Sequence, residues 1–514
     1  MELKARLIDL ESGGKMIAVL NVDDAAEIGA RSQSRVTLKC DGKTLTAIIN
    51  TTDKIIRHGE LGVLEEVKAK LGIRESDTVT VELASPPQSL AYVRNRLRGR
   101  KLNYEETVEI IQDVVEGKLS EIEIASFVTS LYYHGIDLDE ATNLSLAMVE
   151  TGQRIDFGKR PVVDKHSIGG VPGDKTTLLV VPIVAASGLT IPKSSSRAIT
   201  SAAGTADRAE NLMPVNLSLD EMRSVIGKTN ACIMWGGTLD LSPADDIFIK
   251  VEFPLSIDPL LLPSIISKKK AVGSEYVVID IPCGWGAKIK TLDEANLLAR
   301  DFIELGRRLQ MNIRCAITYG SQPIGYSVGP ALEAKEALEN LARTKQSPDL
   351  IDKATDVAGI LLDMVHGGGG KATAVDMLKS GKAEEKLRDI IEAQGGDRDV
   401  TPDDIPLGEH VFNVAAKKRG AVAWINNQGV VEMARSAGAP KDKGAGILLN
   451  KKVGDPVRKG ETIFSIYAEK SSKLTNALKA LESETVMMIG EKVEMLMGEV
   501  RAPELAVEKF ILER

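Results

Sequence analysis

The stretch VDKHSIGGVPGDKTT, residues 163–177, decides how this sequence is interpreted. It places Lys165, His166 and Ser167 directly before a pair of glycines, and an apolar run begins at Leu178. Glycine and proline serve tight bends, so a polar connecting loop is one interpretation. The other is an anion-binding loop, in which glycines bring backbone N–H groups close to a phosphate and a lysine and hydroxyls complete the shell. The stretch by itself leaves both interpretations open.

The segments around this stretch favour anion binding. PVVDKH (161–166) is typical of a strand, and PGDKTT (172–177) of a helix start that Asp174 can cap. A second polar loop, PKSSSRAITSAAGTAD (192–207), follows the next strand and leads into a helix predicted over ITSAAGTADRAE (199–210). Its serines could cap that helix, but a cap needs only one or two hydroxyls. Since successive parallel strands end at one sheet edge, the two loops predict an anion or phosphoester site there.

Composition limits the classes of protein that fit. The 514 residues are 43% hydrophobic and 27% charged, as in an ordinary globular protein of several domains. Aromatic residues make up only 4% and the net charge is −8, so nucleic acid is not an expected partner. The first residues lack an apolar signal core and no run approaches the ~18 apolar residues of a membrane span, which predicts a cytoplasmic protein without a membrane partner. The four cysteines form no CxxC pair, so no metal site is expected.

Hydrophobic periodicity divides the chain into four parts. Short β-type runs are followed by amphipathic helices, then by alternating strands and helices, and finally by β-type runs again. The predicted fold class is α/β multidomain: a small helical domain and a large α/β domain with a mostly parallel sheet, plus a β-barrel-like N-terminal extension and a β-rich C-terminal subdomain. The predicted boundaries are 1–84 for the extension, 88–155 with a second segment at about 245–273 for the helical domain, 158–400, interrupted by 245–273, for the α/β phosphate-binding domain, and 401–514 for the C-terminal subdomain.

Five separate segments resemble one family. KHSIGGVPGD (165–174) and IPKSSSRAITSAAGTAD (191–207) look like the signature of the thymidine phosphorylase family, also called nucleoside phosphorylase-II. The helical segment 99–152 is similar to the N-terminal helical domain of that family. The resemblance continues through IGYSVGPALEAKEAL (324–338) and RGAVAWIN (419–426), so it covers about residues 88–505.

The β-rich extension, the proline in GGVPGDKTT and the SRAITS loop resemble the archaeal branch of that family, which acts on nucleoside 5′-monophosphates. The resemblance implies a pentosyltransferase that converts AMP and phosphate to adenine and ribose 1,5-bisphosphate in nucleotide degradation. Inorganic phosphate is then a co-substrate, and no metal or organic cofactor is expected. The resemblance also implies a homo-oligomer built on a dimer of helical domains.

The same resemblance assigns candidate residues. His166 would lie beside the sugar, where direct catalysis and a merely hydrogen-bonded strand-end histidine both remain open. Asp258 is implied as the proton donor, although Asp258-Pro259 taken alone could be a helix cap. The residues implied to hold inorganic phosphate are Lys165, Ser167, Thr177, Ser195 and Thr205.

A nucleotide substrate brings a second phosphate, so further anion-binding groups are expected. Ser264 and Lys268 are four residues apart and share one helix face, which suits recognition of the base. The candidate substrate-binding residues are Gly170, Ser196, Arg197, Ala198, Ile199, Thr200, Ser201, Thr205, Ser264, Lys268 and Lys288.

Three alternatives compete with this interpretation. A pyrimidine nucleoside (thymidine) phosphorylase would have an arginine near position 251 and a histidine in the second loop, where this chain has KVEF (250–253) and Ser201. GYSVG (325–329) and HGGGG (366–370) resemble α/β-hydrolase motifs, but in that fold the oxyanion loop precedes the serine. KVGDPVRKGETIF (452–464) resembles a carrier-domain hairpin, yet it lacks the modified lysine at the turn, so a non-catalytic carrier or binding module is a minor alternative.

The extension generates a prediction about assembly. Deletion of residues 1–84 should lower the number of subunits in the oligomer, because the extra barrel implies association beyond the dimer. Light scattering of the full chain and of the truncated chain measures this. Identical numbers of subunits in the two proteins would remove the proposed role of the extension.

Overall fold

The computed structural model describes residues 1–198 and 201–490. Six strands close into an N-terminal barrel in the order β1-β5-β2-β4-β3-β6. Alternate residues of β3, Val36 and Leu38 among them, point into the barrel and are fully buried. Closure leaves no free sheet edge. The elements are β1 (Glu2–Leu7), β2 (Ile17–Asn21), α1 (Val22–Glu27), β3 (Arg35–Cys40), β4 (Lys43–Thr52), β5 (Glu60–Val63), α2 (Glu65–Leu71) and β6 (Thr78–Leu83).

The helical domain combines two separate segments of the chain. Helices from the second segment pack on the first, and Phe127 contacts Phe248 with ring centroids 6.0 Å apart. Capping boxes begin two of the helices, at Asn103 and at Ser120. The helices are α3 (Ser89–Leu97), α4 (Tyr104–Val115), α5 (Glu121–His134) and α6 (Leu138–Glu150), followed later in the chain by α10 (Pro243–Leu255) and α11 (Leu261–Ala271).

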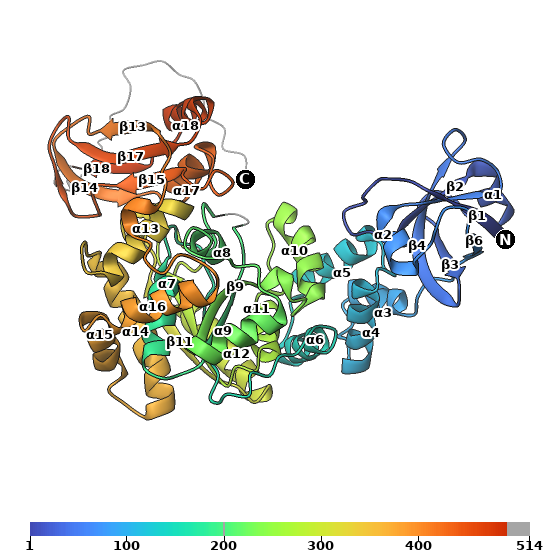
Figure 1. Ribbon diagram of the computed structural model, residues 1–514, viewed down its shortest axis with the longest axis horizontal. Helices are drawn as coiled ribbons and strands as arrows, with labels where there is room; N and C mark the ends of the chain where they lie inside the picture. Colours follow the sequence, from blue (N-terminus) through green and yellow to red (C-terminus); the bar gives the residue numbers. More distant parts are fainter. Residues whose placement is uncertain (199–200, 491–514) are drawn as a thin grey trace, which may run out of the picture.

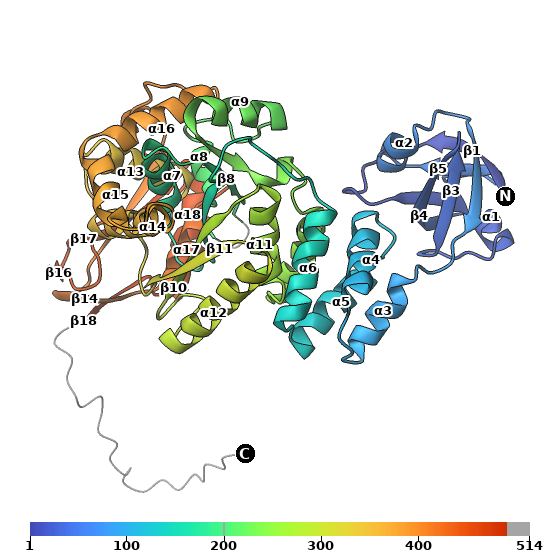
Figure 2. The ribbon, with the colours of Figure 1, turned by 90° about the horizontal axis from the view of Figure 1, so that it is seen from below.

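Polar contacts join the barrel to the helical domain. Arg35 of β3 donates from Nε to the carbonyl of Lys118 at 2.6 Å and also pairs with Glu123. Lys15 pairs with Glu121 at 2.6 Å. The barrel lies at one end of the molecule, and helices α3–α6 lie between it and the α/β domain (Figures 1 and 2). Within the described residues, every helix falls short of the length and apolarity that a bilayer crossing requires.

Parallel strands form the centre of the α/β domain. β10 pairs in parallel with both β7 and β11, and β8 pairs in parallel with β9. A parallel bridge between Val162 and Thr190 joins the two groups of strands. The predicted fold class is confirmed. The strands are β7 (Val163–Ser167), β8 (Ile191–Ser195), β9 (Ala231–Trp235), β10 (Tyr276–Cys283) and β11 (Asn312–Tyr319).

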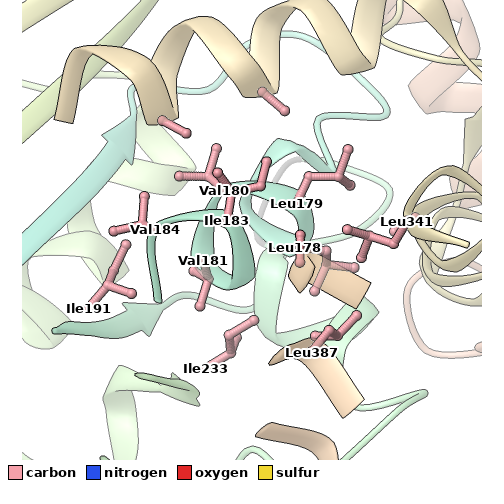
Figure 3. Packing of buried hydrophobic residues seen from close by; sticks show 14 of the residues in the cluster. Leu178, Leu179, Val180, Val181, Ile183, Val184, Ile191, Ile233, Leu341 and Leu387 are labelled. Atoms are coloured by element: carbon pink, nitrogen blue, oxygen red, sulfur yellow. The ribbon is translucent and has the colours of Figure 1, made fainter. Parts of the chain in front are cut away.

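Helix α7 (Thr176–Ala186) lies in the middle of this domain, and every residue from Thr176 to Ala185 is buried. Figure 3 shows its side chains packed between Ile191 and Ile233 of the sheet on one side and Leu341 and Leu387 of two covering helices on the other. The remaining helices are α8 (Thr205–Ala209), α9 (Leu219–Thr229), α12 (Leu292–Arg308), α13 (Pro330–Leu341), α14 (Pro348–His366), α15 (Gly370–Lys379) and α16 (Lys382–Ala393), with 3-10 turns at Gly236–Thr238 and Pro402–Asp404.

The helix predicted over 199–210 is wrong in extent, since only Thr205–Ala209 is helical. Residues 199 and 200 lie outside the described residues, and 201–204 are not helical. The Asp207 carboxylate accepts from the backbone N–H groups of Ala198, at 2.7 Å, and Gly204, at 2.8 Å. These bonds fold the loop back on α8, so the helix begins only after Gly204.

The C-terminal region is antiparallel β structure. One sheet has the order β12-β15-β17-β13 and the other β16-β14-β18. Ser327, in the middle of GYSVG, lies on a strand paired antiparallel with β15 and does not form a nucleophile elbow. KVGDPVRKGETIF supplies β16 and the start of β17. The elements are β12 (Ser327–Val328), β13 (His410–Ala415), β14 (Gly420–Ile425), α17 (Asn427–Ser436), β15 (Gly446–Leu449), β16 (Pro456–Val457), β17 (Thr462–Ala468), α18 (Ser471–Ser483) and β18 (Met487–Gly490).

Candidate functional site

The glycine loop after β7 lies against a second predicted segment. Gly169 and Gly170 have φ values of 78° and 89°, in the left-handed region that favours glycine. A Cβ on Gly170 would lie 2.9 Å from the backbone nitrogen of Lys288. Only glycine therefore allows the loop and the Lys288 segment to approach this closely, and the fold brings together two candidates that are 118 positions apart.

Lys165 and Ser195 present polar atoms that lack partners among the described residues. Lys165 is buried, and no carboxylate of residues 1–198 or 201–490 lies within 4.0 Å of its ammonium. Burial lowers the pKa of Lys165. The Ser195 hydroxyl is also buried and without a hydrogen-bond partner in the described part of the chain, as is the Thr176 hydroxyl at the start of α7. Buried polar groups without partners are uncommon, and a phosphate would satisfy them.

The other candidates for phosphate binding lie at the starts of helices or in the loop. Thr177 is buried in the first turn of α7. Thr205 begins α8, and its hydroxyl oxygen accepts from Arg208 at 3.2 Å. The Ser167 hydroxyl accepts from the backbone N–H of Gly169 at 3.3 Å, inside the glycine loop. Helix N-termini carry positive potential, so Thr177 and Thr205, each in the first turn of a helix, suit contact with an anion.

His166 is an uncharged imidazole at neutral pH. Burial lowers its pKa well below the usual value, and the nearby lysines Lys269, Lys193, Lys268 and Lys165 lower it further. The histidine therefore does not supply positive charge to an anion. The effect of Lys268 on this pKa also shows that α11 lies close to the end of β7.

Asp258 and Lys288 meet across the site. Lys288 Nζ lies 3.3 Å from Asp258 Oδ2, and both side chains are about half exposed, at 47% and 46%. Asp258 precedes α11, but its side chain does not cap that helix, whose N-cap is Leu260. The interpretation of Asp258 as a helix cap is therefore wrong. Because Lys288 also lies against Gly170, the predicted proton donor is connected to the phosphate loop.

On α11, Lys268 is paired with α10. Its ammonium contacts the buried carboxylate of Asp245. Burial acts to lower the pKa of Lys268, but Asp245, Asp246 and Glu252 together outweigh burial and raise it, so the ammonium stays charged. Ser264 lies one turn earlier on the same helix face.

Acidic groups surround Arg197, in the loop that follows β8. Arg197 donates two hydrogen bonds to Glu210, at 2.7 and 2.9 Å, and one to Asp207 at 3.3 Å. Its guanidinium lies 5.1 Å from the centre of the Trp235 ring. The bond with Glu210 raises the pKa of Arg197, and Arg197 lowers that of Glu210 to about 2. The charge of Arg197 is thus compensated in this structure.

The C-terminal domain also contacts this loop. Arg435 of α17 donates to the carbonyl of Ser201 at 3.2 Å, and Lys443 pairs with Glu210 at 3.0 Å. Ala202 is buried in the core of the C-terminal domain. The candidates Ile199 and Thr200 lie outside the described residues.

Sequence reasoning missed the charged groups beneath the site. Asp164 is fully buried in β7 and pairs with Lys269 of α11 at 2.7 Å, and Lys193 lies 3.7 Å from the same carboxylate. Asp280 in β10 pairs with Lys353 of α14 at 2.8 Å. A signal was present, since PVVDKH and YVVIDIP each place an aspartate inside an apolar strand. Their partners come from distant segments and could not be assigned.

Glu252 is a further carboxyl that the sequence analysis did not select. It is buried in α10, and its Oε1 accepts from the backbone N–H of Leu260 at 3.3 Å, directly after the Asp258 turn. Burial raises the pKa of Glu252 to about 7, and the charges of Asp258 and Asp245 contribute in the same direction. Glu252 therefore takes up or releases its proton near neutral pH, beside the Asp258 turn.

Three family descriptions match the chain. "Glycosyl transferase family, helical bundle domain" matches residues 90–152, and "Glycosyl transferase family, a/b domain" matches residues 159–384. "Pyrimidine nucleoside phosphorylase C-terminal domain" matches residues 421–487. The crystal structure of anthranilate phosphoribosyltransferase (TrpD) from Thermus thermophilus has a similar fold, with a TM-score of 0.51 and 19% identity, over 59% of this chain and 98% of that chain. The fold and the site therefore define a glycosyl transferase.

Similar proteins place the chain in a more specific group of glycosyl transferases. A protein of Thermofilum pendens named AMP phosphorylase is 47% identical over 514 residues, which is 100% of both chains. One of the same name from Thermococcus kodakarensis is 49% identical over 93% of this chain and 96% of its own length. The chain belongs to the nucleoside phosphorylase-II family, within the group of relatives named AMP phosphorylase. The resemblance seen in the sequence motifs is confirmed.

The raised pKa of Glu252 predicts a pH-dependent stability. The folded state binds this proton more tightly than the unfolded chain, whose glutamate titrates near 4.5. The stabilisation is therefore complete below pH 4.5 and is lost as the pH rises through about 7. Against Glu252→Gln, the wild type should lose on the order of 3 kcal/mol of unfolding free energy across this window.

Urea denaturation of both proteins between pH 4 and 8 measures the difference. Glu221→Gln is the control, because the Ser218 backbone N–H lowers the pKa of Glu221 and its contribution should change in the opposite direction. Parallel stability curves for the wild type and Glu252→Gln would contradict the prediction.

Proposed function

We propose that this chain catalyses the phosphorolysis of nucleoside 5′-monophosphates, converting AMP and phosphate to adenine and ribose 1,5-bisphosphate. The observation that carries the proposal is identity of 44–49%, over nearly the whole chain, to relatives named AMP phosphorylase. The geometry supports it: Lys165 is buried and has no ion-pair partner among residues 1–198 and 201–490, and the glycine loop beside it lies against Lys288, which pairs with Asp258.

In this reaction an oxygen of inorganic phosphate attacks C1′ of the ribose as the bond to the base breaks. Lys165, Ser195 and the start of α7 hold the phosphate, since their polar atoms lack other partners in the described chain. Holding both reactants in one site removes much of the entropic cost of their encounter. His166, being neutral, lies beside the sugar without repelling the positive charge that develops there.

The departing base carries negative charge and needs a proton. Asp258 has to take up a proton from solvent before the bond breaks; it then donates this proton to the base, which leaves Asp258 as a carboxylate beside the Lys288 ammonium. Opposite charge at 3.3 Å stabilises that product state. Ser264 and Lys268, which share one face of α11, border the base.

A homo-oligomer built on a dimer of helical domains is also part of the proposal. Three apolar or aromatic side chains of α5 are strongly exposed, Ile122 at 78%, Tyr132 at 59% and Tyr133 at 82%. Such side chains suit burial against a second subunit. Action in the cytoplasm stays a prediction from the sequence.

Phosphate-dependent release of base from AMP, adenosine and thymidine, assayed side by side, tests the proposed function. AMP should be by far the best substrate, because only it offers a 5′-phosphate to the second anion site. Asp258→Asn should lower kcat for AMP by about 10²–10⁴-fold, since the amide cannot donate the proton. Faster turnover of thymidine than of AMP would assign the chain to pyrimidine nucleosides, and no release from any substrate would refute phosphorolysis.

Arg197 gives a second prediction. If its guanidinium reaches the 5′-phosphate, Arg197→Ala should lower kcat/KM for AMP by roughly 10- to 150-fold and that for adenosine much less. Glu210→Gln is the matched control, because it frees Arg197 from its main partner while keeping the arginine. An equal loss with both substrates would show that Arg197 only shapes the loop.

A third prediction concerns cofactors. Catalysis should need no metal ion, because cationic side chains and hydroxyls bind the phosphate. In the described part of the chain, potential metal ligands gather at Cys40, Asp41 and Asp77, which belong to the barrel rather than to the phosphate loops. Exhaustive chelation followed by assay with AMP should leave the rate unchanged. A rate restored only by added divalent ion would contradict this.

A further inference from the structure

Two carboxylates face Lys165, yet neither is paired with it. After burial, Asp174 and Asp280 are the groups that act most strongly on the pKa of Lys165, and both raise it. Neither comes within 4.0 Å of the ammonium. A buried lysine that stays this far from two nearby carboxylates needs a reason, since a charge pair in a low-dielectric site is strongly attractive.

The reason is a second buried lysine, Lys353 of α14. Its ammonium lies 2.8 Å from Asp280 Oδ2 and 3.4 Å from Asp174 Oδ2, so it bridges the two carboxylates. Thr318 donates to the other oxygen of Asp280 at 2.6 Å, and the Thr176 backbone N–H donates to Asp174 at 3.2 Å. Burial alone would lower the pKa of Lys353, but the two carboxylates raise it, so it remains an ammonium.

The neighbouring cations cannot replace Lys353. Arg208 pairs with Glu333 at 2.8 Å, and Lys175 pairs with Glu336 at 2.9 Å and donates to three backbone carbonyls. Lys353 is thus the group that neutralises the two carboxylates. Without it, two negative charges would face one lysine, and that lysine would pair with them instead of with an incoming anion.

We propose that Lys353 is a positioning residue for inorganic phosphate: by holding Asp174 and Asp280, it keeps the ammonium of Lys165 available to the phosphate. The inference rests on the proposed function only for the identity of the anion. No motif pointed to Lys353, because it lies 188 positions after Lys165, on a helix that covers the sheet.

The test is the affinity of the full-length protein for inorganic phosphate, measured by calorimetry without nucleotide. Lys353→Met should raise the Kd for phosphate roughly 10- to 100-fold, whereas Lys353→Arg should keep most of the affinity. The Kd for AMP, measured without phosphate, should change much less, since its own phosphate binds at the other loop. A general structural defect would weaken both ligands alike.

Lys371→Met is the matched control. Lys371 also bridges two carboxylates, Asp352 at 2.9 Å and Asp356 at 2.7 Å, but it is half exposed and belongs to α15. Its substitution should leave the Kd for phosphate unchanged. The comparison of Lys353→Met with Lys371→Met shows whether a weaker affinity for phosphate comes from the loss of the bridge at Lys353 or from the loss of any lysine that bridges two carboxylates.

A double variant keeps the test decisive if Lys353→Met does not fold. Lys353→Met with Asp174→Asn removes one negative charge together with the positive one, and asparagine still accepts from Thr176. It should recover most of the affinity for phosphate. Wild-type affinity in Lys353→Met, or a double variant that binds phosphate no better than Lys353→Met or not at all, would overturn the proposal.

The outcome is separable from that of the proposed function. If the wild type binds phosphate and Lys353→Met does not, the inference stands even where AMP is not cleaved. If the wild type itself binds no phosphate, the inference is wrong.

Discussion

The ion pair between Asp164 and Lys269 is the interaction on which the site depends. Asp164 lies in the central strand β7 and Lys269 in α11, and the two side chains are 0% and 1% exposed at a distance of 2.7 Å. The pair joins the sheet to the helical segment that also presents Ser264 and Lys268. Removing either partner would leave a buried charge uncompensated, which is strongly destabilising. The strand that bears Lys165 and His166 is thereby fixed against helix α11.

Lys193 completes this arrangement without adding a full charge. Burial lowers its pKa well below the usual value, and Lys269 lowers it further. Its nitrogen donates to the carbonyl of Ser194 at 2.6 Å, so it secures the end of β8 directly before Ser195. Strands β7 and β8 therefore share one buried carboxylate, Asp164, which helps to hold their carboxyl ends side by side.

The site is assembled from every part of the chain except the barrel. The α/β domain supplies the phosphate loops, the helical segment supplies Asp258 and Lys268, and the C-terminal domain supports the loop at Ser201 through Arg435. The C-terminal domain, which contains no candidate catalytic residue, therefore contacts the loop that follows β8 at Ser201.

The fold class and the family could be predicted from the amino-acid sequence, because strand, glycine loop and helix start are local patterns with a fixed physical meaning, whereas the roles of the candidate site residues stay predictions. Which charges meet could not be predicted in this way. The pairing of Arg197 with Glu210, the bridge made by Lys353 and the protonated carboxyl of Glu252 depend on burial and on partners from distant segments. The extent of the helix predicted over 199–210 was also decided by a tertiary constraint, the Asp207 carboxylate that folds the loop back. Local propensity has no information on such contacts, since desolvation and Coulomb attraction act only once the chain has folded.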